Sequence, residues 1–196
     1  PQLERFEAVR ELPGELGCTK SVIANLERAL KEGWDLFLLL EDDLVWNDDD
    51  APSRLQDQIS ETIEQGGDGA VLTTFHGNEY RSSAIASSIF HRVHYATDTG
   101  ATLFTTSGAR EMLRVQKSAL KSYQAAIRKS GLSTSTSRKT IHLTTDRVRE
   151  KVFESQLWLA PCKETDMVVR QPGGYSDLGH AVIALDNVRD KERVRE

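Results

Sequence analysis

The sequence predicts an α/β layered fold with a mostly parallel central sheet. Segments with apolar residues at helical spacing alternate with short apolar runs, and the connections between them are short. The run "DLFLLL", 35–40, is almost continuously apolar, which is typical of a strand buried on both faces within a parallel sheet. No internal repeat is present.

The first predicted helix covers 20–32, with Thr19 or Ser21 as N-cap and Gly33 just beyond its end. Its apolar stripe consists of Val22, Ile23, Leu26, Ala29 and Leu30. The predicted strand 35–40 follows at once, so this pair is the first helix–strand unit of the fold.

Two further units follow the same pattern. In "DDDAPSRLQDQISETIEQGGDG", Asp50 is the predicted cap, Pro52 lies in the first turn, and the two glycines 66–67 end the helix. A strand at 69–75 comes next. A strand near 101–105 then leads into a helix capped by Thr106 or Ser107, whose apolar residues are Met112, Leu113, Val115 and Leu120.

Two polar segments interrupt the alternation without suggesting a domain boundary. The Ser/Thr-rich stretch 129–140 is predicted to be a mobile loop, and 186–196 a charged tail. We therefore predict a single domain over 1–185.

Composition indicates an ordinary globular protein, because 38% of its residues are hydrophobic and 28% charged. No apolar run approaches the roughly 20 residues of a membrane-spanning helix, and the first residues do not resemble a signal peptide. We therefore expect a cytoplasmic protein or a fragment whose targeting segment lies elsewhere. Cys18 and Cys162 lie far apart and form no metal-binding pair; two reduced thiols are expected.

Charge is distributed unevenly around a net value of -5, which argues against general nucleic-acid binding. Acidic residues dominate 35–68, where Arg54 is the only basic residue, and basic residues dominate 110–151. Two solvated faces of opposite charge would explain this. Alternatively, an acidic metal site lies opposite a basic surface suited to phosphorylated ligands or a membrane-bound anionic acceptor, with the protein peripheral at the membrane.

The stretch "FLLLEDDLVW", 37–46, places three adjacent carboxylates, Glu41, Asp42 and Asp43, at the carboxyl end of the predicted strand. Open α/β sheets bind ligands at such ends. Carboxylates at i and i+2 point the same way along an extended chain and can hold a hard divalent cation. Turn or capping roles are the alternative, and capping is our interpretation of the second acidic run, 48–50.

Several blocks of the chain resemble glycosyltransferase family 25, the lipopolysaccharide and procollagen sugar transferases. The main block is "GELGCTKSVIANLERALKEGWDLFLLLEDDLVW", 14–46, and "ERFEAVR", 4–10, is similar to the segment that precedes it in that family. "GATLFTTSGAREML", 100–113, and "VVRQPGGYSDLGH", 168–180, resemble later family segments.

The resemblance implies a GT-A fold, a UDP-hexose donor carrying galactose or glucose, and Mn²⁺ or Mg²⁺ as cofactor. On this pattern Asp43 is the principal metal ligand, and Glu41 contacts the metal or the donor. His180 is the candidate for a late ligand, with a surface or hydrogen-bonded role as the alternative. Asp42, Gln171 and Ser176 are the implied donor-binding residues.

The implied acceptor is a hydroxyl group on a glycan, lipopolysaccharide or protein-linked sugar. An inverting reaction needs a carboxylate base for that hydroxyl, and Asp146 is the first candidate and Asp177 the second. A simple N-cap role for Asp146 stays open.

The sequence departs from the family in three places. The family's first strand lies upstream of its Arg-Phe-x-Ala segment, so we expect this chain to lack that strand. Val22 replaces the family's His after Ser21, and a Thr-Thr pair replaces the Pro-hydrophobic pair before Asp146. A non-catalytic remnant that acts as a sugar-binding or interaction module is therefore the second hypothesis, and a magnesium-dependent phosphatase or nuclease ranks last.

Overall fold

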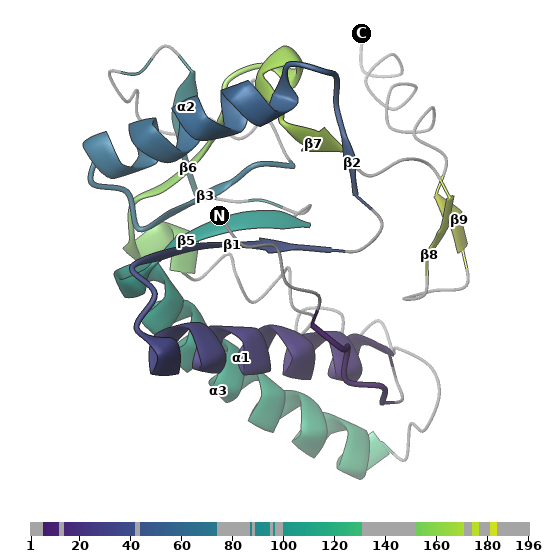
Figure 1. Cartoon of the computed structure of the whole chain (residues 1–196). Helices are drawn as coiled ribbons and strands as arrows, with labels where there is room; N and C mark the ends of the chain where they lie inside the picture. The colour runs from purple at the N-terminus through teal and green to yellow at the C-terminus, as the bar shows by residue number, and fades with distance from the viewer. Residues whose placement is uncertain are drawn as a thin grey trace, which may run out of the picture.

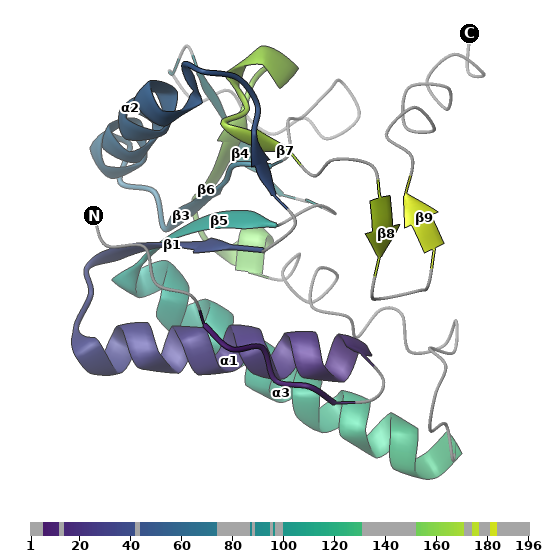
Figure 2. The ribbon, with the colours of Figure 1, turned by 45° about the vertical axis from the view of Figure 1, so that its right-hand side comes forward.

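The structure of the chain, a computed structural model, describes residues 6–11, 14–41, 44–73, 87, 89–94, 96, 100–130, 152–170, 174–176 and 181–183. It has three layers, with a central sheet between helix α2 on one face and helices α1 and α3, which run side by side, on the other (Figures 1 and 2). The α/β prediction is confirmed at this level.

The labelled helices among the described residues are α1 (Gly14–Glu32), α2 (Ala51–Glu64) and α3 (Thr106–Ser130), with a short 3-10 helix η3 at Glu164–Asp166 and a further helical turn at 152–155. The central sheet holds β1 (Leu36–Leu40), β3 (Gly69–Val71), β4 (Phe90–Val93), β5 (Ala101–Thr105) and β6 (Trp158–Pro161). Two small antiparallel ribbons complete the described elements: β2 (Val45–Trp46) with β7 (Val169–Arg170), and β8 (Gly174–Ser176) with β9 (Ala181–Ile183).

The prediction of a mostly parallel sheet is wrong. The strand order is β1-β5-β3-β6-β4, and only β3 and β6 pair in parallel, whereas the other three pairings are antiparallel. Helices cover both faces of this sheet, so its strands are apolar at successive positions whichever way they run. Burial on both faces therefore did not indicate strand direction.

Strand β1 is half-buried along its whole length, in contrast to the full burial expected for 35–40. It ends the described sheet and pairs there only with β5. Side chains on the flank of a sheet keep some contact with solvent, and this accounts for the difference.

The helix starts also differ from the predicted caps. Helix α1 begins at Gly14, so Thr19 and Ser21 lie inside it. At α3 the hydroxyl of Thr105 accepts a hydrogen bond from the N–H of Gly108, at 3.4 Å, so Thr105 occupies the capping position predicted for Thr106 or Ser107. Gly33 and Gly66 adopt the left-handed conformation, with φ of 72° and 65°, just after α1 and α2.

The core has one apolar cluster on each face of the sheet. Phe104 of β5 lies at the centre of the α1/α3 side, where it stacks on Phe37 at 5.1 Å between ring centroids and meets Trp158 edge-on at 5.5 Å. On the α2 side, Leu103 of β5 and Leu72, which directly follows β3, belong to a buried cluster against which Leu55 and Ile59 of α2 pack. The rings connect β1, β5 and β6, which are not all adjacent in the sheet, within one apolar cluster.

Other predictions fall partly outside the described residues. The strand predicted at 69–75 is present as β3, and 74–75 are not described. Residues 129–130 of the predicted loop belong to α3, while 131–140 and the tail 186–196 lie outside the described residues. The single-domain boundary at 185 stays a prediction.

Among the described helices, none combines the length and the apolar composition needed to cross a bilayer. Cys18 and Cys162 are both half-buried and form no disulfide with each other.

Candidate functional site

The carboxyl ends of three strands meet at one edge of the sheet. Strand β5 runs antiparallel to both β1 and β3, and β3 runs parallel to β6, so β1, β3 and β6 share one direction. Side chains that follow these strands are therefore brought to a common edge, which is where ligands of open α/β sheets bind.

Glu41 lies at this edge. Its N–H donates to the carbonyl oxygen of Gly100 at 2.8 Å, which extends the pairing of β1 with β5 by one residue. On the other side of β5, the N–H of Ala101 donates to the hydroxyl of Thr73 at 3.4 Å. The backbone of Glu41 is thus held by the sheet, and the residue as a whole is exposed.

A second segment reaches the same region through the β2–β7 ribbon. Val45 pairs with Arg170 and Trp46 with Val169, and the N–H of Asn47 donates to the carbonyl oxygen of Val168 at 3.0 Å. The chain that leaves the acidic triplet therefore runs alongside the chain that leads into Gln171.

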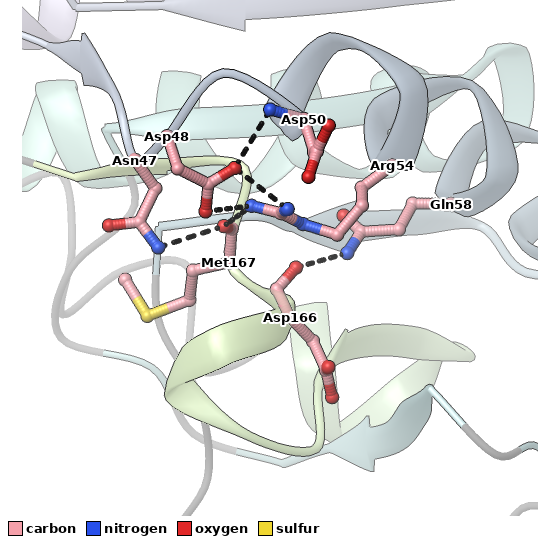
Figure 3. Close-up of polar contacts among 7 residues, drawn as sticks. All are labelled: Asn47, Asp48, Asp50, Arg54, Gln58, Asp166 and Met167. Carbon is pink, nitrogen blue, oxygen red and sulfur yellow. Dashed lines mark hydrogen bonds and ion pairs between the residues drawn. The ribbon is translucent and has the colours of Figure 1, made fainter.

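A network centred on Arg54 anchors this ribbon to α2 (Figure 3). The guanidinium of Arg54 donates two hydrogen bonds to the carboxylate of Asp48, at 2.9 and 2.8 Å, and one to the carbonyl oxygen of Met167 at 3.2 Å. The Asn47 amide donates to that same carbonyl at 3.3 Å, and Asp48 also accepts the N–H of Asp50 at 3.0 Å.

Gln58 extends the network one turn further along α2. It is buried, and its amide nitrogen donates to the carbonyl oxygen of Asp166 at 2.5 Å. Two side chains of α2 thus hold consecutive carbonyl groups, those of Asp166 and Met167, just before β7 begins. The contact joins segments more than 100 residues apart in the chain.

Electrostatics favour the ionised form of this pair. The hydrogen bonds from Arg54 lower the pKa of Asp48 below its usual value, and Asp48 in turn raises the pKa of Arg54. Asp50 occupies the N-cap position of α2 but makes no side-chain capping bond. The predicted capping role of the acidic run 48–50 is therefore wrong in detail, because its first carboxylate binds Arg54 and the N–H of Asp50 instead.

Of the predicted site residues, only Glu41 is fully described. Ser176 is the last residue of β8, where only the backbone is described. The others lie outside the described residues: Asp42, Asp43, Asp146, Gln171, Asp177 and His180. Around Glu41, the described residues bring together no group of three or more His, Cys, Asp or Glu side chains that could hold a metal ion.

The structure adds two residues that sequence reasoning missed, Trp46 and Arg170. Both are exposed on the β2–β7 ribbon beside the acidic segment, and Trp46 keeps 49% of its surface accessible. The signal in the sequence was slight: Trp46 closes the stretch "FLLLEDDLVW", and Arg170 directly precedes Gln171.

Two blocks that carry the family resemblance also touch each other. The N–H of Val9 donates to the hydroxyl of Ser21 at 2.8 Å, and that hydroxyl donates to the carbonyl oxygen of Gly17 at 2.9 Å. A side chain at Gly17 would collide with the carbonyl oxygen of Val9, and Glu11 forms an ion pair with Lys20. The glycine and the serine of the block 14–46 are therefore the docking points for residues 6–11.

No protein-family model matches the chain, and no curated protein matches it.

Proposed function

We propose that this chain is a metal-dependent glycosyltransferase of the GT-A fold. In this proposal it moves a hexose, galactose or glucose, from a UDP-sugar to a hydroxyl group of a glycan, lipopolysaccharide or protein-linked acceptor, with inversion. One observation supports it above the others: the acidic triplet follows β1 at the edge where the carboxyl ends of β1, β3 and β6 meet.

The proposed metal ligands are Glu41 and Asp43, with His180 as a third. Carboxylate oxygens suit Mn²⁺ and Mg²⁺, and Glu41, which is exposed at the sheet edge, can meet a cation from solvent. When bound, the ion supplies Lewis acidity for the diphosphate leaving group.

Donor binding falls in this proposal to Asp42, Gln171 and Ser176, with Arg170 added on the strength of its position. An exposed guanidinium beside the acidic segment can pair with phosphate oxygens in a bidentate way. Trp46 offers the ring face of an exposed indole to a sugar, together with one N–H donor.

The acceptor hydroxyl loses its proton to a carboxylate as it attacks the anomeric carbon. Asp146 is the proposed base, and Asp177 is the second candidate. Both roles follow from the family resemblance.

A non-catalytic sugar-binding or interaction module is the second candidate function. The half-burial of β1, which pairs only with β5 among the described strands, favours it, since a donor site is better enclosed when its strand is central. The module would keep the β2–β7 ribbon and its exposed Trp46 as a sugar contact.

The two functions are separated by measuring UDP release from UDP-galactose and UDP-glucose with Mn²⁺ and a panel of glycan acceptors. We expect turnover in the wild type and at least a 100-fold loss in Asp43→Asn, since the principal ligand is removed. Asp49→Asn is the matched control, because Asp49 is an exposed residue of the neighbouring acidic run whose side chain makes no hydrogen bond or ion pair among the described residues. Turnover that survives Asp43→Asn, or turnover equal with and without metal, would contradict the proposal.

A further inference from the structure

Helix α3 carries a row of basic side chains on its outer surface. Its members, here called the α3 stripe, are all exposed: Arg110, Arg114, Lys117, Lys121 and Arg128. At about 100° per residue they fall within roughly 60° of arc, and at 1.5 Å per residue the row is about 27 Å long. The stripe is therefore straight and parallel to the helix axis.

The stripe points directly away from the core. Most buried apolar residues of α3 lie on the far side of the helix, about 130–170° around its axis from the middle of the stripe, and Ala109 lies about 110° from it: Met112, Val115, Ala119 and Tyr123 form the far side. Because the opposite side of α3 packs against the sheet and α1, all five cations project into solvent in one direction.

Most of this charge is not neutralised by neighbours. Arg114 pairs with Glu111 at 2.5 Å and Lys117 with Glu27 of α1 at 2.6 Å, and both are surface ion pairs that contribute little and exchange easily. Within the part of the chain that the structure describes, Arg110, Lys121 and Arg128 have no side-chain hydrogen bond or ion pair.

The segment on the other side of the sheet carries the opposite charge. Helix α3 holds six basic residues and one acidic residue, whereas 48–64, which includes α2, holds six acidic residues and one basic residue. The sheet separates these helices (Figures 1 and 2). A helix alone is about 10 Å across, so α2 is farther from a surface bound at the stripe than the Debye length of about 8 Å at physiological salt. The acidic residues of α2 are therefore screened from that surface.

We propose that the α3 stripe docks this protein on the surface of an anionic phospholipid bilayer. The five cations form a straight row and face one way, so all of them can approach a flat anionic surface at the same time. Each Lys or Arg near such a surface strengthens binding about five-fold. The stripe contains no large apolar side chain, so the contact is peripheral, reversible and sensitive to salt.

A bilayer fits this surface better than a nucleic acid does. The stripe has no aromatic side chain on which a base could stack, and among the described residues the neighbouring helix α1 has three acidic and three basic residues, so α1 does not widen the stripe into a broad basic surface. The inference is independent of the proposed enzymatic function, because it rests on α3 alone.

Sedimentation of the full chain with vesicles tests this directly. We expect binding to vesicles of equal parts phosphatidylglycerol and phosphatidylcholine in 50 mM NaCl, at least ten-fold weaker binding in 500 mM NaCl, and none to pure phosphatidylcholine. The triple substitution Arg110→Gln, Lys121→Gln, Arg128→Gln should weaken binding about 100-fold.

A matched triple, Arg10→Gln, Lys31→Gln, Lys163→Gln, removes the same charge from exposed positions outside α3 and should weaken binding less than three-fold. The pair Arg110→Lys, Arg128→Lys keeps the charge and should keep full binding, which guards against a folding defect in the first triple. Equal losses in both triples, salt-independent binding, no binding to anionic vesicles, or tighter binding to duplex DNA or RNA than to vesicles would overturn the proposal.

Discussion

Asp48 accepts two hydrogen bonds from Arg54, whose guanidinium also reaches the carbonyl oxygen of Met167. From the sequence, the acidic run 48–50 was expected to cap a helix, and Arg54 was noticed only as an isolated cation. The contact of Arg54 with the carbonyl oxygen of Met167 could not be predicted from the sequence. The two residues are more than 100 positions apart, and no residue pattern near Arg54 indicates a backbone partner so distant. This pairing gives the second acidic run a structural role.

Asp48→Asn should therefore change the pH dependence of stability. The pKa of Asp48 is lowered in the folded protein, so its contribution is present above the unfolded value of about 3.9 and is lost as pH falls through the folded value. Denaturant titrations should show wild type more stable than Asp48→Asn at neutral pH, with the gap shrinking below about pH 4. Asp49→Asn is the control, because it removes a carboxylate of the same run without removing a hydrogen bond. A stability difference between wild type and Asp48→Asn that does not change with pH would contradict the assignment.

The elements were predicted well where periodicity is long and poorly where direction or pairing matters. The strand 101–105 and the part of α3 up to Leu120 were predicted, because apolar residues at a regular spacing indicate the conformation of a segment. The continuation of α3 to Ser130 was not predicted, and 129–130 were assigned to a loop. Strand direction was predicted wrongly, because coverage by helices on both faces makes parallel and antiparallel strands look alike. The two-residue strands β2 and β7 were missed, because two residues show no periodicity at all.

Near the start of α1, Gly17 allows residues 6–11 to lie close against the helix because it has no side chain. In Gly17→Ala the added methyl group would collide with the carbonyl oxygen of Val9, while α1 itself gains helix propensity of about 1 kcal/mol. We expect unchanged or higher helical content by circular dichroism, together with at least ten-fold faster hydrogen exchange at the amide of Val9, which bonds to Ser21. Ser21→Ala should speed that exchange without the steric change, and retained protection in both variants would show that residues 6–11 are held by other contacts.

Across the whole molecule, the aromatic cluster of Phe37, Phe104 and Trp158 ties β1, β5 and β6 into one core under α1 and α3. The sequence indicated which residues are apolar, and the structure shows that they unite strands at different positions in the sheet. The candidate site depends on this arrangement, because the edge that carries Glu41 exists only when β1, β5 and β3 are in register.

Phe104→Ala should accordingly destabilise the entire fold. Phe104 is fully buried, and truncation of a buried Phe costs about 3–5 kcal/mol through lost contacts and the cavity that remains. Chemical denaturation should show a single transition shifted by that amount. Ile63→Ala, at a side chain 58% exposed on α2, should shift it by less than about 0.5 kcal/mol. A local loss confined to β5, with the rest of the protein unaffected, would contradict a shared core.

Prediction of the candidate site from sequence reached the acidic triplet and its place after a strand, and the structure puts Glu41 at the sheet edge as expected. The β2–β7 ribbon with Trp46 and Arg170 required the tertiary structure, because these residues meet only through long-range pairing.

The most direct test of the central claim is calorimetric titration of UDP into the full chain with and without Mn²⁺, repeated on Asp43→Ala and on Asp49→Ala. The account predicts binding that requires Mn²⁺, that disappears in Asp43→Ala, and that Asp49→Ala retains. Absence of UDP binding to the wild type in the presence of Mn²⁺, or binding that neither metal removal nor Asp43→Ala diminishes, would contradict it.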